Sequence, residues 1–116
     1  MDDELELNGL HIAPDVVETI VIMAVGSIES VAALGSAKAE GNGVKQRNQR
    51  QARKAVLVTS ADDKLVIDVH VTVRFGYHLR DIATQIREVV DSAVETQLGI
   101  RVAAVNVFID GLKFED

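Results

Sequence analysis

Residues 64–75 carry an apolar side chain at every second position, with polar side chains between them from Asp68 onward, and this pattern constrains the fold most. The apolar positions are Leu65, Ile67, Val69, Val71, Val73 and Phe75. Successive side chains of a β-strand point to opposite faces of a sheet, so strict alternation predicts a strand with one face in a core. The polar positions Asp68, His70, Thr72 and Arg74 then lie on the other face. A second layer is expected to cover the apolar face alone.

Two helical segments flank this strand. The first begins at Pro14, because proline suits a first helical turn, and ends near Gly26-Ser27. Its predicted apolar stripe is Val16, Val17, Ile20, Val21 and Ala24. The second helix follows Gly76 and ends before Gly99, which is typical of a left-handed C-terminal cap. Its predicted stripe is Leu79, Ile82, Ala83, Ile86, Val89, Val90, Ala93, Val94 and Leu98.

Three further strands are predicted, over residues 31–34, 55–59 and 101–110. The element order is therefore α-β-β-β-α-β. This order predicts an α+β fold, a two-layer sandwich in which two helices pack on one face of a small, mixed sheet of three to four strands. The length of 116 residues fits a single domain over residues 1–116.

The net charge of −6 hides a split between two parts of the chain. Residues 35–54 carry a balance of +5, which leaves −11 for all other residues. The basic residues of the segment are Lys38, Lys45, Arg47, Arg50, Arg53 and Lys54. The segment has three glycines and no apolar periodicity, so we expect a flexible loop. An acidic leader, residues 1–11, precedes the first helix.

Two surfaces are candidates for binding a partner. The basic loop could bind the phosphates of nucleic acid or of anionic lipids. No aromatic residue interleaves its cations to stack on bases, and a solvated loop balanced against the acidic body is the simpler interpretation. The second candidate is the sheet face opposite the helices, which we expect to be open and to carry Asp68, His70, Thr72, Arg74, Asn106 and Phe108.

Catalytic chemistry finds little support in the sequence. The chain has no cysteine, and no base is placed near Ser60 or Ser92 by local spacing. Asp62 and Asp63 fit a hairpin turn better than an acid–base pair. His70 and His78 with Asp68 could be imagined as a metal site, but their spacing matches no ligand motif. We expect no catalytic residue, no metal, no cofactor and no small-molecule substrate.

Four segments carry a family resemblance: Ile12-Ala13-Pro14-Asp15-Val16-Val17-Glu18-Thr19-Ile20, Ser27-Ile28-Glu29-Ser30-Val31, Val69-His70-Val71-Thr72-Val73-Arg74-Phe75-Gly76, and Leu98-Gly99-Ile100-Arg101-Val102-Ala103-Ala104-Val105-Asn106-Val107. They resemble the alkaline shock protein family, the Gls-type general stress and envelope stress response proteins. Members usually have glycine in place of Ser30 and tyrosine in place of Phe75.

The resemblance implies an abundant, non-catalytic cytoplasmic protein of mostly Gram-positive bacteria. It also implies self-association into a homo-oligomer and, for some members, a membrane-anchored protein partner that holds them at the inner side of the cell membrane. The longest apolar run, residues 20–25, is too short to insert into a bilayer, and the acidic start implies no export. The alternative function is a small nucleic-acid-binding α+β module that uses residues 38–54.

Overall fold

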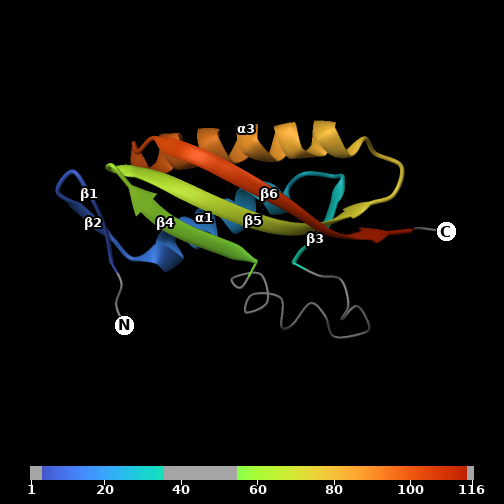
Figure 1. Cartoon of the computed structure of the whole chain (residues 1–116), viewed down its shortest axis with the longest axis horizontal. Coiled ribbons are helices and arrows are strands. Elements are labelled where there is room, and N and C mark those ends of the chain that lie inside the picture. The colour runs from blue at the N-terminus through green and yellow to red at the C-terminus, as the bar shows by residue number, and fades with distance from the viewer. Residues whose placement is uncertain (1–3, 36–54, 115–116) are drawn as a thin grey trace.

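The computed structural model describes residues 4–35 and 55–114 (Figure 1). The elements are β1 (Leu5–Leu7), β2 (Leu10–Ile12), α1 (Pro14–Gly26), β3 (Val31–Leu34), β4 (Val56–Ala61), β5 (Lys64–Arg74), α3 (Leu79–Leu98) and β6 (Val102–Lys113). Strand β5 is the alternating segment, and it lies at the centre of a four-stranded sheet.

The two edges of β5 are occupied differently. Strand β6 runs parallel to it along its whole length. The other edge is shared end to end by two antiparallel strands, because β4 pairs with residues 64–69 and β3 pairs with residues 71–73. The sheet is therefore mixed, and both helices lie on one of its faces (Figure 1). The predicted α+β fold class is confirmed.

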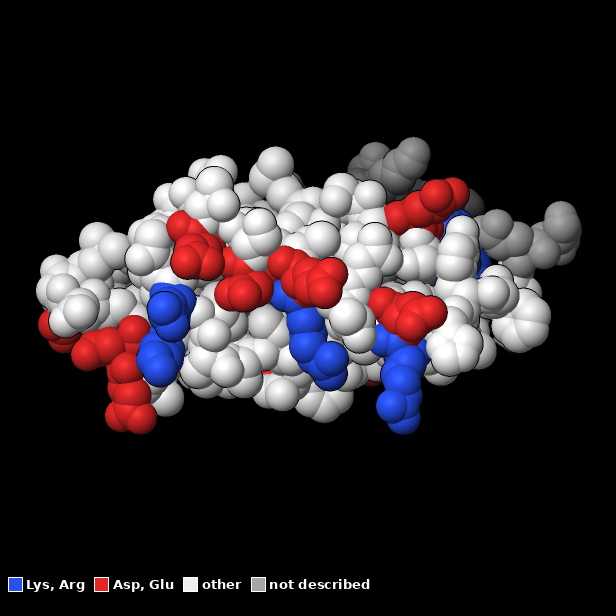
Figure 2. Space-filling view, turned by 90° about the horizontal axis from the view of Figure 1, so that it is seen from above, with Lys and Arg blue, Asp and Glu red and all other residues white. Residues whose placement is uncertain are grey.

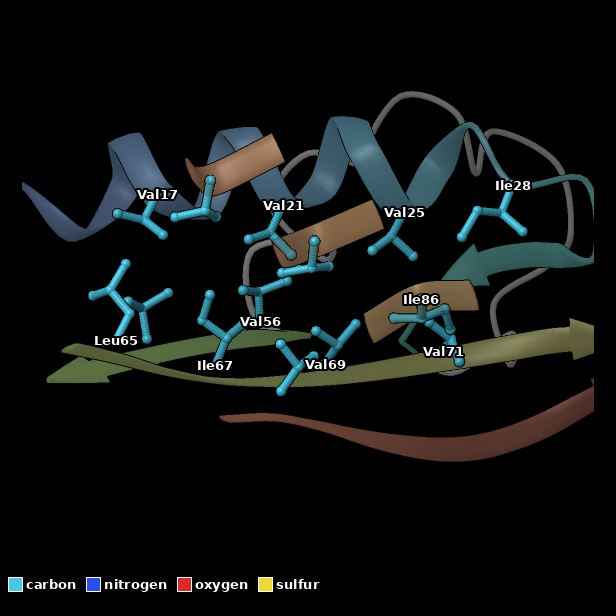
Figure 3. Packing of buried hydrophobic residues seen from close by; sticks show 14 of the residues in the cluster. Val17, Val21, Val25, Ile28, Val56, Leu65, Ile67, Val69, Val71 and Ile86 are labelled. Carbon is cyan, nitrogen blue, oxygen red and sulfur yellow. The ribbon is translucent and has the colours of Figure 1, made fainter. Parts of the chain in front are cut away.

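The core lies between this sheet and the two helices (Figure 3). The apolar side chains of β5 that face the helices are fully buried: Leu65, Ile67, Val69, Val71 and Val73. Helix α1 covers them with Val17, Val21 and Val25, and α3 covers them with Ile82, Ile86, Val90 and Val94. Each such side chain contributes about 1.5–3 kcal/mol by leaving water, so this interface carries most of the stability.

The stripe predicted for α1 is rotated relative to the one observed. Val16 is exposed, and Val25 is buried although the prediction omitted it. Buried positions in α1 recur every four residues, and a residue next to Val17 in sequence lies about 100° away around the helix, which turns Val16 from the sheet. Leu79, the first residue of α3, is also exposed, although it was predicted as part of the apolar stripe of this helix.

Residues 5–12, which begin inside the predicted acidic leader of residues 1–11 and extend one residue past it, form an antiparallel hairpin of β1 and β2. Asn8 and Gly9 make its turn, and both have positive φ. The hairpin belongs to the core, because Leu5, Leu7 and Ile12 are buried. The Asn8 backbone N–H also donates to the Asp63 carboxylate at 3.1 Å, which joins this turn to the turn between β4 and β5.

The second helix ends as predicted. Gly99 adopts a left-handed conformation with φ of 71°, and its N–H donates to the Glu95 carbonyl at 2.9 Å. The next residue, Ile100, is buried. Strand β6 then continues to Lys113, three residues beyond the predicted end, because a bulge at Asp110 restores its pairing with the last residues of β5.

Candidate functional site

The candidate site is the face of the sheet that the helices leave uncovered. Neighbouring polar side chains of β5 and β6 are tied to each other across this face. The Asn106 amide donates to the Asp68 carboxylate at 2.8 Å, and His70 Nδ1 lies 3.0 Å from Asp110 Oδ2. The His70 ring also stacks on Phe108, with ring centroids 4.4 Å apart. These side chains are thus held in place before any partner binds.

Two large apolar side chains project from the same face. Leu57 of β4 lies opposite Asp68 in the strand register and is 58% exposed. Phe108 of β6 is 43% exposed. Leu57 was not predicted as a site residue, because it lies in the continuous apolar run 55–58. Such a run does not indicate which of its side chains face the core and which face outward. The face therefore combines fixed polar groups with exposed apolar anchors.

Thr72 does not belong to this exposed surface, contrary to the prediction. Its side chain is fully buried, and its hydroxyl donates to the Gly35 carbonyl at 2.7 Å. Gly111 of β6 lies opposite it, and a Cβ at that position would come within 3.3 Å of the Thr72 hydroxyl oxygen. The backbone on both sides thus covers Thr72. Its side chain holds neighbouring segments of the sheet together and is not accessible to a binding partner.

Arg74 lies at the end of β5 and is half-buried. Its Nε donates to the Glu29 carbonyl at 2.9 Å, and its own N–H donates to the Ser30 carbonyl at the same distance. Arg74 therefore anchors the segment that leads into β3. Its side chain is committed to this intramolecular role.

The ends of the basic segment attach to a single residue of the site. The Gly35 N–H donates to the His70 carbonyl at 2.7 Å, and the His70 N–H donates to the Ala55 carbonyl at 2.8 Å. An unbroken antiparallel strand would use one residue for both bonds. Residues 36–54 are therefore inserted into one edge strand, opposite His70. The six basic residues of the predicted loop lie outside the described residues: Lys38, Lys45, Arg47, Arg50, Arg53 and Lys54.

The two histidines considered for metal binding lie beside different carboxylates. His70 pairs with Asp110, and His78 lies 3.9 Å from Asp81 on the first turn of α3. Asp68, the third member of the imagined set, accepts a hydrogen bond from Asn106. Within residues 4–35 and 55–114, no three His, Asp or Glu side chains are grouped to hold a metal ion.

The charges on the side of α3 have no single sign. Figure 2, which views the molecule from the side of α3, shows Asp and Glu next to Lys and Arg along its length. A helix that binds anionic lipid concentrates Lys and Arg on its polar face, so this surface does not suit that role. No helix in the described part of the chain is long and apolar enough to cross a membrane.

A two-layer α+β module with an ordered open sheet face is the class of protein that this structure defines. The model of the alkaline shock protein family, described as having a cell envelope-related function, matches residues 2–114. The chain belongs to this family, which confirms the resemblance seen in the sequence.

Two curated relatives are similar over most of their length. The chain is 27% identical over 113 residues to "Uncharacterized protein YqhY" of Bacillus subtilis, which covers 97% of this chain and 83% of the relative. It is also 27% identical over 105 residues to "Uncharacterized protein Spy1614" of Streptococcus pyogenes serotype M6, which covers 90% of this chain and 87% of that protein.

Proposed function

We propose that this protein is a non-catalytic interaction module of an envelope-related stress response, and that it associates with further copies of itself. The observation that carries the proposal is the open sheet face, where Leu57 and Phe108 are exposed beside side chains already fixed by mutual contacts. Association costs less when interface side chains are ordered beforehand, because less rotamer freedom is lost. Aromatic anchors commonly carry much of the energy of such interfaces.

The test of self-association is light scattering coupled to size-exclusion chromatography of the full chain over a range of concentrations. We expect a species heavier than the 12.6 kDa monomer that dissociates on dilution. A Leu57→Ser, Phe108→Ser double variant is expected to shift the equilibrium toward monomer. Met23→Ser is the matched control, because Met23 is 69% exposed but lies on α1. A strict monomer at high concentration contradicts self-association.

We further propose that the protein acts on the cytoplasmic side of the envelope through a membrane-anchored partner. The family description as envelope-related supports this location, and the mixed charge of the α3 side favours a protein partner over direct lipid binding. Affinity purification from detergent-solubilised membranes of the native host tests it. Recovery of no membrane protein above the level seen with an extract that lacks the tagged chain contradicts this role.

Nucleic acid binding is the second candidate, and one observation favours it. The segment with a charge of +5 leaves and re-enters the sheet beside the open face, at Gly35 and Ala55. Binding through such cations weakens steeply with salt, because condensed counterions are released. An RNA titration at about 50 mM and about 200 mM salt distinguishes this function. No binding at the lower salt concentration excludes it.

A further inference from the structure

Strand β6 has one backbone edge that faces away from the sheet. At the other edge of β5, the His70 N–H donates to Ala55 and the His70 carbonyl accepts from Gly35. Successive residues of a strand direct these groups to opposite sides, so Val69 and Val71 direct theirs toward β6. Val69 is the register partner of Val107, and Val71 is the register partner of Ile109. In a parallel pair, the backbone hydrogen bonds of a residue go to the residues before and after its register partner, not to the partner itself.

Val107 and Ile109 therefore direct their own N–H and carbonyl groups outward. The same alternation holds at Val105, whose carbonyl accepts a hydrogen bond at 3.4 Å from Arg87 of α3. No described strand other than β5 pairs with β6. Proteins usually protect such an edge with proline or lysine. Residues 102–109 of β6 contain neither, and the first charged side chain after Val102 is that of Asp110.

We propose that β6 pairs antiparallel with β6 of a second copy about a two-fold axis at Phe108. This inference rests on the proposed self-association and names one contact within it, at the β6 edge of the open face, in which Phe108 takes part and Leu57 does not. In this register Val107 lies opposite Ile109 of the second copy, and the two residues exchange their outward backbone bonds. The Arg87 contact at Val105 lies outside the pairs that this register needs.

The side chains of β6 support this register. Phe108 lies opposite its own copy on the open face, so the stack of His70 on Phe108 extends into two further rings. Asn106 lies opposite Asp110, which places an amide beside a carboxylate and avoids like charges. An axis at Val107 would instead place Asn106 opposite Phe108. An axis at Asn106 would place Phe108 opposite Ala104 and lose the aromatic pair.

The first test uses the absence of cysteine from the chain. In the proposed register the two Phe108 Cα atoms are about 4.5 Å apart, within the range that a disulfide requires. Phe108→Cys is expected to form a covalent dimer on mild oxidation. Leu57→Cys is the matched control, since Leu57 is exposed on the same face but on β4. Equal or faster cross-linking of Leu57→Cys overturns the proposed register.

The second test uses the unaltered chain and does not depend on a variant that folds. Amide hydrogen exchange at Val107 and Ile109 is expected to slow at least tenfold between dilute and concentrated protein, as measured by nuclear magnetic resonance. The Phe108 amide, which donates within the sheet, serves as the internal control and is expected to change much less. Light scattering on the same samples reports association.

The outcomes separate this inference from the function on which it rests. A chain that associates while exchange at Val107 and Ile109 stays constant overturns the β6 interface and leaves self-association standing. A chain that remains monomeric overturns both. Protection of the two amides that is independent of concentration assigns the edge to a contact within one chain and overturns the interface. If the two amides become protected only when solubilised host membrane protein is added, β6 pairs with a strand of another protein. That result overturns pairing between two copies.

Discussion

The imidazole ring of His70 lies nearly parallel to the phenyl ring of Phe108, with their planes inclined by 10° and their centroids 4.4 Å apart. The two residues are direct partners in the parallel register of β5 and β6. His70 also holds both ends of the inserted segment through its backbone. One residue thus joins the central strand, the outer strand and the insertion point, and its contacts can be tested separately.

The stacking of His70 on Phe108 is expected to be a net stabilising contact. A double-mutant cycle with His70→Ala and Phe108→Ala is expected to give a coupling free energy of about 0.5–1.5 kcal/mol, typical of aromatic pairs. Urea unfolding of the four proteins measures it. Additive effects of the two substitutions would show that the stacked geometry contributes no stability.

Deletion of residues 36–55 is expected to leave the fold intact. Gly35 alone would then face His70, provide both backbone bonds and lead directly into Val56, which lies opposite Val69. Each halving of a loop lowers its closure cost by about 0.6 kcal/mol, so the midpoint of thermal unfolding should be kept or raised. Circular dichroism during heating measures this midpoint.

A deletion one residue longer is the control for this experiment. Removal of residues 35–55 leaves Val56 opposite His70 and shifts β4 by one residue. A shift by one residue moves every side chain of a strand to the opposite face. Buried Val56 and Val58 would then face solvent, and we expect a large loss of stability. Equal midpoints for the two deletions would contradict the assignment of one position opposite His70.

The buried Thr72 hydroxyl is expected to stabilise the start of the inserted segment. Thr72→Val keeps the volume of the side chain but leaves the Gly35 carbonyl without this donor. We expect a loss of about 1 kcal/mol in the free energy of unfolding, measured with urea. Thr59→Val on β4 is the comparison, because Thr59 is exposed and its hydroxyl contact is long, at 3.5 Å. A Thr72→Val protein as stable as the parent would contradict this role.

Ser30→Ala is expected to raise stability. Ser30 is buried, and its hydroxyl has no hydrogen-bond partner in the described part of the chain. Removal of an unsatisfied buried hydroxyl gains about 1 kcal/mol, which corresponds to about 4 °C in the thermal midpoint of a small domain. Scanning calorimetry measures the change. Ser60→Ala, at an exposed site in β4, should change the midpoint little, and a fall on Ser30→Ala would count against the prediction.

Two glycines at helix ends are expected to respond differently to alanine. Gly99 has φ of 71°, so Gly99→Ala is expected to cost about 1 kcal/mol through strain in the left-handed cap. Gly26 ends α1 without a positive φ and with open space around it, so Gly26→Ala should be neutral or slightly stabilising. Urea unfolding of both variants checks the difference, and equal losses would contradict the assignment of the cap.

The longest elements could be predicted from the sequence because their patterns are long. Apolar residues at every second position from Leu65 to Val73 locate β5, and an apolar stripe over about five turns, followed by Gly99, locates α3. The β1–β2 hairpin was not predicted, because its strands have three residues each and lie among acidic side chains. The Asn8-Gly9 pair was the signal that could have found it, since this dipeptide favours two-residue hairpin turns.

The candidate site could be predicted in part. Alternation along β5 and β6 places His70 and Phe108 on one face, but it does not indicate that they stack, because stacking depends on the strand register. Burial of Thr72 depends on Gly35 and Gly111, which belong to two other parts of the chain. That β3 and β4 share one edge of β5 follows from pairing over long sequence distances, which local patterns do not encode.

The central position of β5 has a consequence for how the protein loses its structure. Every other strand of the four-stranded sheet pairs with β5, and its buried side chains face both helices. Without β5, the strands β3, β4 and β6 have no partner within this sheet, and the helices lose the apolar face that they cover. We therefore expect no stable, partly unfolded intermediate. The hairpin, helices and sheet are expected to unfold together in one cooperative transition.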